Sequence, residues 1–110
     1  MINSIVKPVS HSLILLWTHE RGEMCNKTIS AAAQWPMGTL VDKHGAKIDP
    51  TTASWDASQA YGIHMQKGQV YWANSVFNDL YLHWPTGMSD GDKQDVIDHL
   101  ESQFLFIKQA

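Results

Sequence analysis

The alternation of apolar and polar positions between residues 61 and 87 is the clearest pattern in this chain, and it predicts a three-stranded antiparallel meander. The first two runs, YGIHMQ and QVYWAN, are separated by Lys67-Gly68, a two-residue break that is typical of a tight β-hairpin. This turn places His64 opposite Tyr71, on the more polar of the two faces of the sheet.

The second turn of the meander, near residues 77–79, can hold two or three loop residues, and this choice decides which face the next strand presents. A two-residue loop leaves both faces mixed, whereas a three-residue loop gathers the apolar side chains on one face. We therefore predict the three-residue loop. The apolar face then consists of Ile63, Met65, Val70, Trp72, Val76, Leu80, Leu82 and Trp84.

A helix is predicted near the C-terminus, where it would cover this apolar face. Ser89, followed three residues later by Asp92, resembles a capping box, and acidic residues suit the first turn of a helix. Apolar side chains then repeat at helical spacing: Val96, Ile97, Leu100 and Phe104.

Shorter elements are predicted before the meander. They are a buried strand over 12–18, a strand ending near 29, one helical turn over 30–34, a hairpin within 39–48 that turns at 43–45, and a loop over 49–58. The fold class that follows is α+β, with an antiparallel sheet of about five to seven short strands and a C-terminal helix packed on one face. We find no linker, so residues 1–110 are expected to form a single domain.

Composition and charge narrow the classes of partner and compartment. Cys25 is the one cysteine, which favours a reducing compartment and a cytoplasmic protein. The net charge of -3, with eight Lys and Arg residues spread along the chain, argues against a nucleic-acid partner. The apolar run at 13–17 is far shorter than the roughly 20 residues of a membrane span, so no membrane association is expected.

The six histidines form no spacing that is typical of a metal site, and there is no second cysteine to complete one. We therefore predict no metal and no cofactor. The sequence contains none of three common functional motifs: the nucleophile elbow of serine hydrolases, the phosphate-binding loop and the dinucleotide-binding glycine motif.

Two histidines and two tyrosines gather on the polar face of the predicted meander: His64, Tyr71, Tyr81 and His83. They could line a polar and aromatic pocket in which an imidazole acts as general base near neutral pH. They could equally be solvent-facing strand residues with no further role. The pattern alone leaves both interpretations open.

Tryptophans are numerous in this chain, with five in 110 residues. Trp17, in the run LILLW, is expected in the core. Trp35 and Trp55 instead lie in loop-like sequence, where a large aromatic side chain either plugs the edge of the core or anchors a partner. Asp56, next to Trp55, could help such a site to bind a cationic or sugar-like group.

These observations favour a small soluble binding protein without enzymatic activity, such as an inhibitor, immunity or accessory factor. It would act on a protein partner through Trp35, Trp55 and Asp56. One alternative is a small-ligand binding domain or simple enzyme that uses the four histidine and tyrosine residues. Another is a structural subunit that assembles through its sheet, as a homodimer for example.

Overall fold

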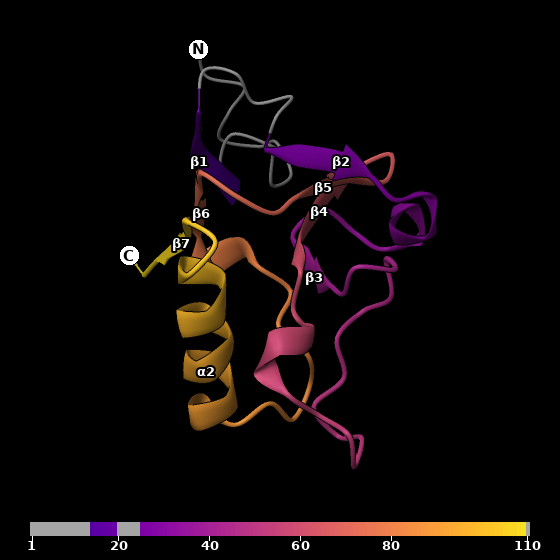
Figure 1. Cartoon of the computed structure of the whole chain (residues 1–110), viewed down its shortest axis with the longest axis vertical. Helices are drawn as coiled ribbons and strands as arrows, with labels where there is room; N and C mark the ends of the chain where they lie inside the picture. Colours follow the sequence, from indigo (N-terminus) through magenta and orange to yellow (C-terminus); the bar gives the residue numbers. More distant parts are fainter. Residues whose placement is uncertain (1–13, 20–24, 110) are drawn as a thin grey trace, which may run out of the picture.

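The computed structural model describes residues 14–19 and 25–109, which form two β-sheets, one α-helix and three short 3-10 helices (Figure 1). The strands are β1 (Leu15–Thr18), β2 (Asn26–Thr28), β3 (Thr39–Val41), β4 (Gly62–Gln66), β5 (Gln69–Tyr71), β6 (Ser75–Asn78) and β7 (Leu105–Lys108). The helices are η3 (Ser30–Gln34), η4 (Ala57–Gln59), η5 (Asp79–Tyr81) and α2 (Asp90–Glu101).

The four-stranded sheet has the order β2-β5-β4-β3 and is antiparallel throughout. The predicted hairpin between β4 and β5 is confirmed. Lys67 (φ 53°) and Gly68 (φ 81°) both adopt the left-handed conformation that a tight two-residue turn requires. A register shift between His64 and Gln66 places His64 opposite Val70, so the predicted pairing of His64 with Tyr71 is wrong.

The three-stranded meander is not formed, because the chain leaves this sheet after β5. Asn74, with a φ of 48°, turns the backbone, and β6 then lies between β1 and β7 in a separate three-stranded sheet. The β1–β6 pair is antiparallel and the β6–β7 pair is parallel. The prediction of one antiparallel sheet is therefore corrected to two sheets, while the α+β class is confirmed.

The predicted third strand of the meander is replaced by the short helix η5. The Asn78 side chain accepts a hydrogen bond from the backbone N–H of Leu80 (3.1 Å) and so begins this helix. Leu80 is 70% exposed, contrary to its predicted place on the apolar face, whereas Leu82 is buried.

The C-terminal helix α2 is confirmed, together with its cap, in which the Ser89 hydroxyl accepts from the backbone N–H of Asp92 (3.1 Å). Its buried residues are Val96, Ile97 and Leu100. The fourth predicted contact is wrong: the helix ends at Glu101, and Phe104 is 63% exposed.

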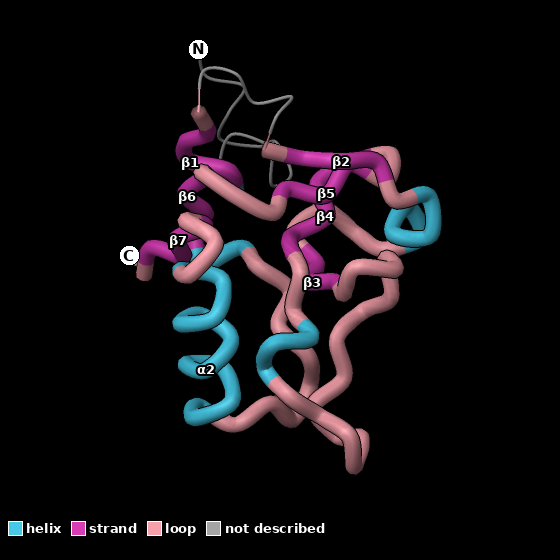
Figure 2. The backbone as a smooth tube through the Cα atoms, in the orientation of Figure 1, coloured by secondary structure: helices cyan, strands magenta, loops and turns pink. Residues whose placement is uncertain are grey.

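One main core joins both sheets to the helix. It contains Leu15, Leu40, Ile63, Met65, Tyr71, Phe77, Leu82, Val96, Leu100 and Leu105 among its buried members. In Figure 1 the two sheets lie side by side and α2 extends below the three-stranded sheet. Figure 2 shows that the connection from β3 to β4 is mostly loop, and that its short helix η4 lies beside α2, with which it is in contact.

Candidate functional site

The three-stranded sheet has an inner face that belongs to the core and an outer face that does not. Its inward positions are Leu15, Phe77 and Leu105, all of them buried. On the other face, strand pairing places Trp17 beside Val76, and Val76 beside Phe106. One apolar side chain from each strand therefore lines up across the outer face, and we call Trp17, Val76 and Phe106 the outer row.

Large apolar side chains in and around the outer row are open to solvent. Trp17 is 54% exposed and Phe106 is 42% exposed, while Leu16, at the irregular position of β1, is 44% exposed. Because an aromatic side chain presents about 150–250 Å² in full, these groups together with Phe104 expose on the order of 400 Å². That total is comparable to the area of the largest apolar patch of a typical monomer, which is often functional.

Phe104, the residue before β7, adds backbone strain to this exposed region. Its φ of 61° lies in the left-handed region, which costs roughly 1–2 kcal/mol for a residue with a Cβ atom. Hydrogen bonds hold it there: its N–H donates to the Glu101 carbonyl (2.9 Å), and its carbonyl accepts from the N–H of Ser75 (3.2 Å). A left-handed residue shortly after a helix, with its N–H bonded back to a carbonyl of the last turn, is a common way for a helix to end.

Charge is distributed unevenly between the two sides of the three-stranded sheet. Within β1, β6 and β7 the single charged residue is Lys108. Helix α2, which packs on the core side of this sheet, instead carries several acidic residues: Asp90, Asp92, Asp95, Asp98 and Glu101. The three described strands of this sheet therefore carry little charge, although the chain as a whole carries a net charge of -3.

Trp35 is half-buried and packs against the small second core of Ala32, Val41 and Val70. Its indole N–H donates to the Gly45 carbonyl (3.0 Å), and the Lys47 ammonium lies 5.9 Å from the ring centroid. The indole N–H of Trp35 is therefore already hydrogen-bonded within the protein.

Trp55 is also half-buried and packs against the main core. The neighbouring Asp56 is exposed, and its carboxylate accepts from the N–H of Ser58 (2.8 Å), which caps η4. Hydrogen bonds from Ser58 lower the pKa of this carboxyl group. The structure thus places Trp55 and Asp56 together on the loop that leads to β4, each with a local structural contact.

His64 lies inside the protein, 2% exposed, and its Nε2 accepts a hydrogen bond from the backbone N–H of Gly68 (3.0 Å). This contact fastens the turn between β4 and β5. Nδ1 is buried and makes no hydrogen bond to the described residues. Burial lowers the pKa of His64, and the nearby carbonyl groups of Pro36 and Trp35 partly offset that effect.

Tyr71 is likewise buried, with its ring edge-on to Phe77 at 6.1 Å between centroids. Burial raises the pKa of the Tyr71 phenol. Tyr81 and His83, in contrast, lie near the surface and line a shallow groove of about 400 Å³. The prediction that His64, Tyr71, Tyr81 and His83 share one exposed face is therefore wrong, because the strand that would have aligned them is not formed.

The groove beside Tyr81 and His83 is mostly apolar. Its other lining residues are Ile14, Pro36, Met37, Leu80 and Leu82. The backbone N–H of His83 donates to the Gly38 carbonyl (2.9 Å), and this bond connects the segment after η5 to the residue before β3. Tyr81 and His83, two of the four predicted ligand residues, thus meet in this groove.

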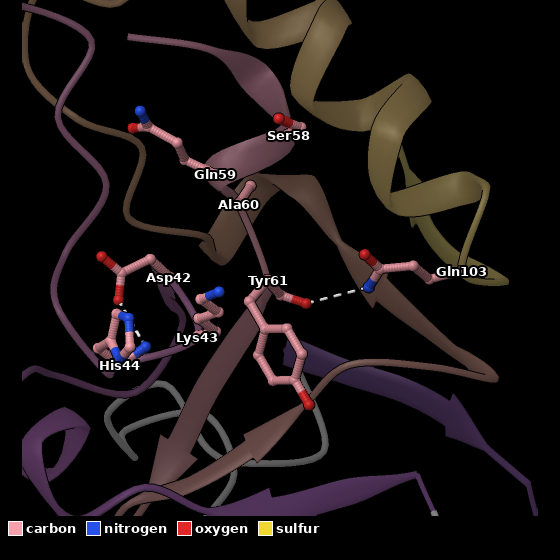
Figure 3. Close-up of a pocket in the computed structure, with 8 residues that line it drawn as sticks. All are labelled: Asp42, Lys43, His44, Ser58, Gln59, Ala60, Tyr61 and Gln103. Carbon is pink, nitrogen blue, oxygen red and sulfur yellow. Dashed lines mark hydrogen bonds between the residues drawn. The ribbon is translucent and has the colours of Figure 1, made fainter. Parts of the chain in front are cut away.

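A second cleft, of about 340 Å³, lies between the turn after β3, the helix η4 and Tyr61 (Figure 3). Several of its polar groups serve the fold. The Gln103 amide donates to the carbonyls of Tyr61 (3.0 Å) and Trp72 (2.8 Å), and the Asp42 carboxylate accepts from the N–H of His44 (2.8 Å). The cleft is therefore braced by internal hydrogen bonds on two sides.

Within residues 14–19 and 25–109, no group of three or more histidine, cysteine, aspartate or glutamate side chains is placed to hold a metal ion. No helix in the described part of the chain is long and apolar enough to cross a membrane. Comparison with known protein families, with curated proteins and with solved structures found no match.

Proposed function

We propose that this chain is a non-enzymatic binding protein that recognises a protein partner through the outer face of its three-stranded sheet. The observation that carries the proposal is the exposure of Trp17 within the outer row. Tryptophan is among the residues that most often supply binding energy at protein interfaces, because one side chain removes a large apolar area from water.

The surroundings of Trp17 support this choice of surface. Val76 and Phe106 continue the apolar area across neighbouring strands, so a partner would meet side chains fixed on strands rather than on loops. A rigid platform loses little conformational entropy on binding. The two loop tryptophans, Trp35 and Trp55, are already packed against the core, so each offers a partner less free area than Trp17 does.

The test is a quantitative capture experiment with the full chain as bait in an extract of its native host. Proteins retained by the parent and lost with Trp17→Ala are the candidate partners, and their affinity for the parent is then measured directly. We expect Trp17→Ala to weaken binding by at least about 2 kcal/mol, or about 30-fold. Trp35→Ala and Trp55→Ala, together with Asp56→Ala, test the loop site in the same assay. If only the loop variants lose the partner, the outer face is not the site.

A second candidate function is supported by the groove that Tyr81 and His83 share. An apolar groove with one imidazole and one phenol suits a small, largely apolar ligand that carries a hydrogen-bonding group. The experiment is a ligand-detected NMR screen with small aromatic and aliphatic acids, repeated with His83→Ala. Signals that are unchanged by this substitution would remove the groove from consideration.

A further inference from the structure

The cleft between the turn after β3, the helix η4 and Tyr61 is lined mainly by polar side chains (Figure 3). Its lining residues are Asp42, Lys43, His44, Ser58, Gln59, Ala60, Tyr61 and Gln103. All of them except Ala60 have a polar group in the side chain. The hydrogen bonds that each group has left to make therefore determine which ligand the cleft can hold.

The Asp42 carboxylate is held in place through one of its two oxygens. Oδ1 accepts hydrogen bonds from the backbone N–H groups of His44 (2.8 Å) and Ala46 (3.0 Å). Oδ2 makes no hydrogen bond to residues 14–19 or 25–109. In Figure 3 one oxygen of Asp42 is turned away from His44. Asp42 therefore offers a ligand an acceptor whose position the turn has already fixed.

The two glutamines of the cleft are fixed in the same way, through their amide nitrogens. Nε2 of Gln103 donates to the carbonyls of Tyr61 (3.0 Å) and Trp72 (2.8 Å). Nε2 of Gln59 donates to the Ser54 carbonyl (2.9 Å). An amide whose nitrogen is bound within the fold presents its oxygen to a ligand. Together with Oδ2 of Asp42, the two Oε1 atoms make a set that we call the three acceptor oxygens.

Lys43 adds a hydrogen-bond donor to this set. Its side chain is exposed, and within the described part of the chain its ammonium makes no hydrogen bond or ion pair. The Ser58 hydroxyl, by contrast, is already hydrogen-bonded to the Asp56 carboxylate. Asp42 is the acidic lining residue and Lys43 the basic one, so their formal charges cancel when the imidazole is neutral. The lining therefore has no net charge that would favour a small ion.

Tyr61 forms an aromatic wall of the cleft, and neighbouring side chains fix its ring. The ring stacks with Trp72 at 6.1 Å between centroids and an interplanar angle of 19°. The Lys27 ammonium lies 5.5 Å from the centroid of the Tyr61 ring. Tyr61 is half-buried, so part of its surface remains available in the cleft. A fixed aromatic surface beside hydrogen-bonding groups suits a ligand that carries both C–H and hydroxyl groups.

We propose that this cleft binds a neutral saccharide of one or two units through the three acceptor oxygens and the Lys43 ammonium. A sugar hydroxyl both donates and accepts, so each one can satisfy an acceptor oxygen or the ammonium. A pyranose carries hydroxyls around its rim and can therefore reach groups on several walls of the cleft. The cleft volume of about 340 Å³ lies at the lower end of the roughly 300–1,000 Å³ of small-ligand sites, which suits a ligand of this size.

Other small ligands match these groups less well. A peptide segment brings N–H and C=O groups in equal number, whereas the cleft presents three acceptor oxygens and one ammonium. An organic cation would be repelled by Lys43, and an anion would be repelled by Asp42. The saccharide site shares no residue with the outer row, so it goes beyond the proposed function and does not depend on it.

The experiment is an NMR titration of the full ¹⁵N-labelled chain with glucose, galactose, mannose, N-acetylglucosamine, lactose and cellobiose. We expect at least one of these sugars to shift the amide signals of residues 42–44, 58–61 and 103, with a Kd of about 1 mM or tighter. N-acetylalanine methylamide, putrescine and acetate are the probes for a peptide, a cation and an anion, and they should leave these signals unchanged.

Two substitutions in the cleft and one outside it test the contacts. Asp42→Asn keeps an oxygen for the two backbone N–H groups and replaces the free acceptor by an amide nitrogen, so it should weaken the sugar at least tenfold. Lys43→Met keeps the aliphatic stem without the donor and should weaken it about fivefold. Asp49→Asn is the matched control, because the Asp49 carboxylate likewise accepts from the backbone N–H two residues on, that of Thr51 (2.9 Å), but lies outside the cleft. This control should bind as the parent does.

Three results overturn the proposal. They are a parent chain whose cleft signals no sugar of the panel shifts, a folded Asp42→Asn or Lys43→Met variant that binds the sugar as tightly as the parent, and a stronger response to the peptide or ionic probes than to any sugar. Circular dichroism establishes that each variant is folded. Trp17→Ala should retain the sugar affinity of the parent, so a failure of the proposed function at the outer face is recognised separately.

Discussion

Replacement of Leu100 by alanine should be among the most destabilising single changes in the chain. Leu100 is fully buried in the main core, where the other members come from both sheets as well as from α2. A buried leucine truncated to alanine costs about 2–5 kcal/mol, and the cost is largest where the surroundings cannot collapse into the cavity. Because strands from two separate sheets hold this cavity open, we expect about 3–5 kcal/mol.

The assay is urea unfolding followed by far-ultraviolet circular dichroism, at a protein concentration too low for association. With a slope of about 1–3 kcal/mol per molar urea, the loss should lower the midpoint by roughly 1–5 M. The matched control is Phe104→Ala, four residues further along the chain. Helical spacing assigns both residues to the core, but Phe104 is 63% exposed, so its truncation should change stability by less than about 1 kcal/mol. Equal losses for the two variants would refute this packing.

Three further changes probe the turns and ties of the fold. Gly62→Ala should destabilise the fold by about 3 kcal/mol in urea unfolding, because an added Cβ atom would overlap the Tyr71 carbonyl oxygen of the paired strand. A urea midpoint equal to that of the parent would contradict the β4–β5 pairing. Burial lowers the pKa of His64, so the unfolded chain takes up a proton at this site before the folded chain does. The free energy of unfolding should therefore fall as the pH drops below about 6.5, until the folded imidazole also protonates. His64→Gln should remove this pH dependence, and a pH profile of stability identical to that of the parent would exclude a role for His64 in it. Asp79→Ala removes the carboxylate that accepts hydrogen bonds from the Trp84 indole and the Lys93 ammonium, so it should lower the free energy of unfolding by about 1–2 kcal/mol in urea. Asp79→Asn keeps one acceptor oxygen and should cost less.

Features with a local chemical cause were predictable from the sequence. The Lys67-Gly68 turn and the Ser89 cap each depend on residues within a few positions of one another, and both are confirmed. The single helical turn at Ser30–Gln34 was recovered for the same reason.

The partition into two sheets was not predictable from local pattern, because β6 pairs with strands far away in the sequence. Alternation shows that a segment can be a strand but does not identify its neighbours. One residue in the left-handed conformation, Asn74, redirects the chain, and an asparagine in a polar stretch gives little warning of it. With the meander lost, the proposed histidine and tyrosine face was lost as well.

The exposed position of Trp17 was hidden by its apolar context. In LILLW, an uninterrupted apolar run favours a strand buried on both faces, and that interpretation placed Trp17 in the core. The structure instead uses β1 at the edge of a sheet with one open face. The apolar run therefore leaves Leu16 and Trp17 exposed to solvent.

Photo-crosslinking from position 17 tests the central claim most directly. A benzoylphenylalanine placed there in the full chain, in cells of the native host, would react with any protein that covers the outer face. We predict a discrete crosslinked product from position 17 and none from position 98, which is exposed on the acidic helix α2. Products that form from positions 35 and 55 but not from position 17 would contradict the account and return the binding site to the loop tryptophans.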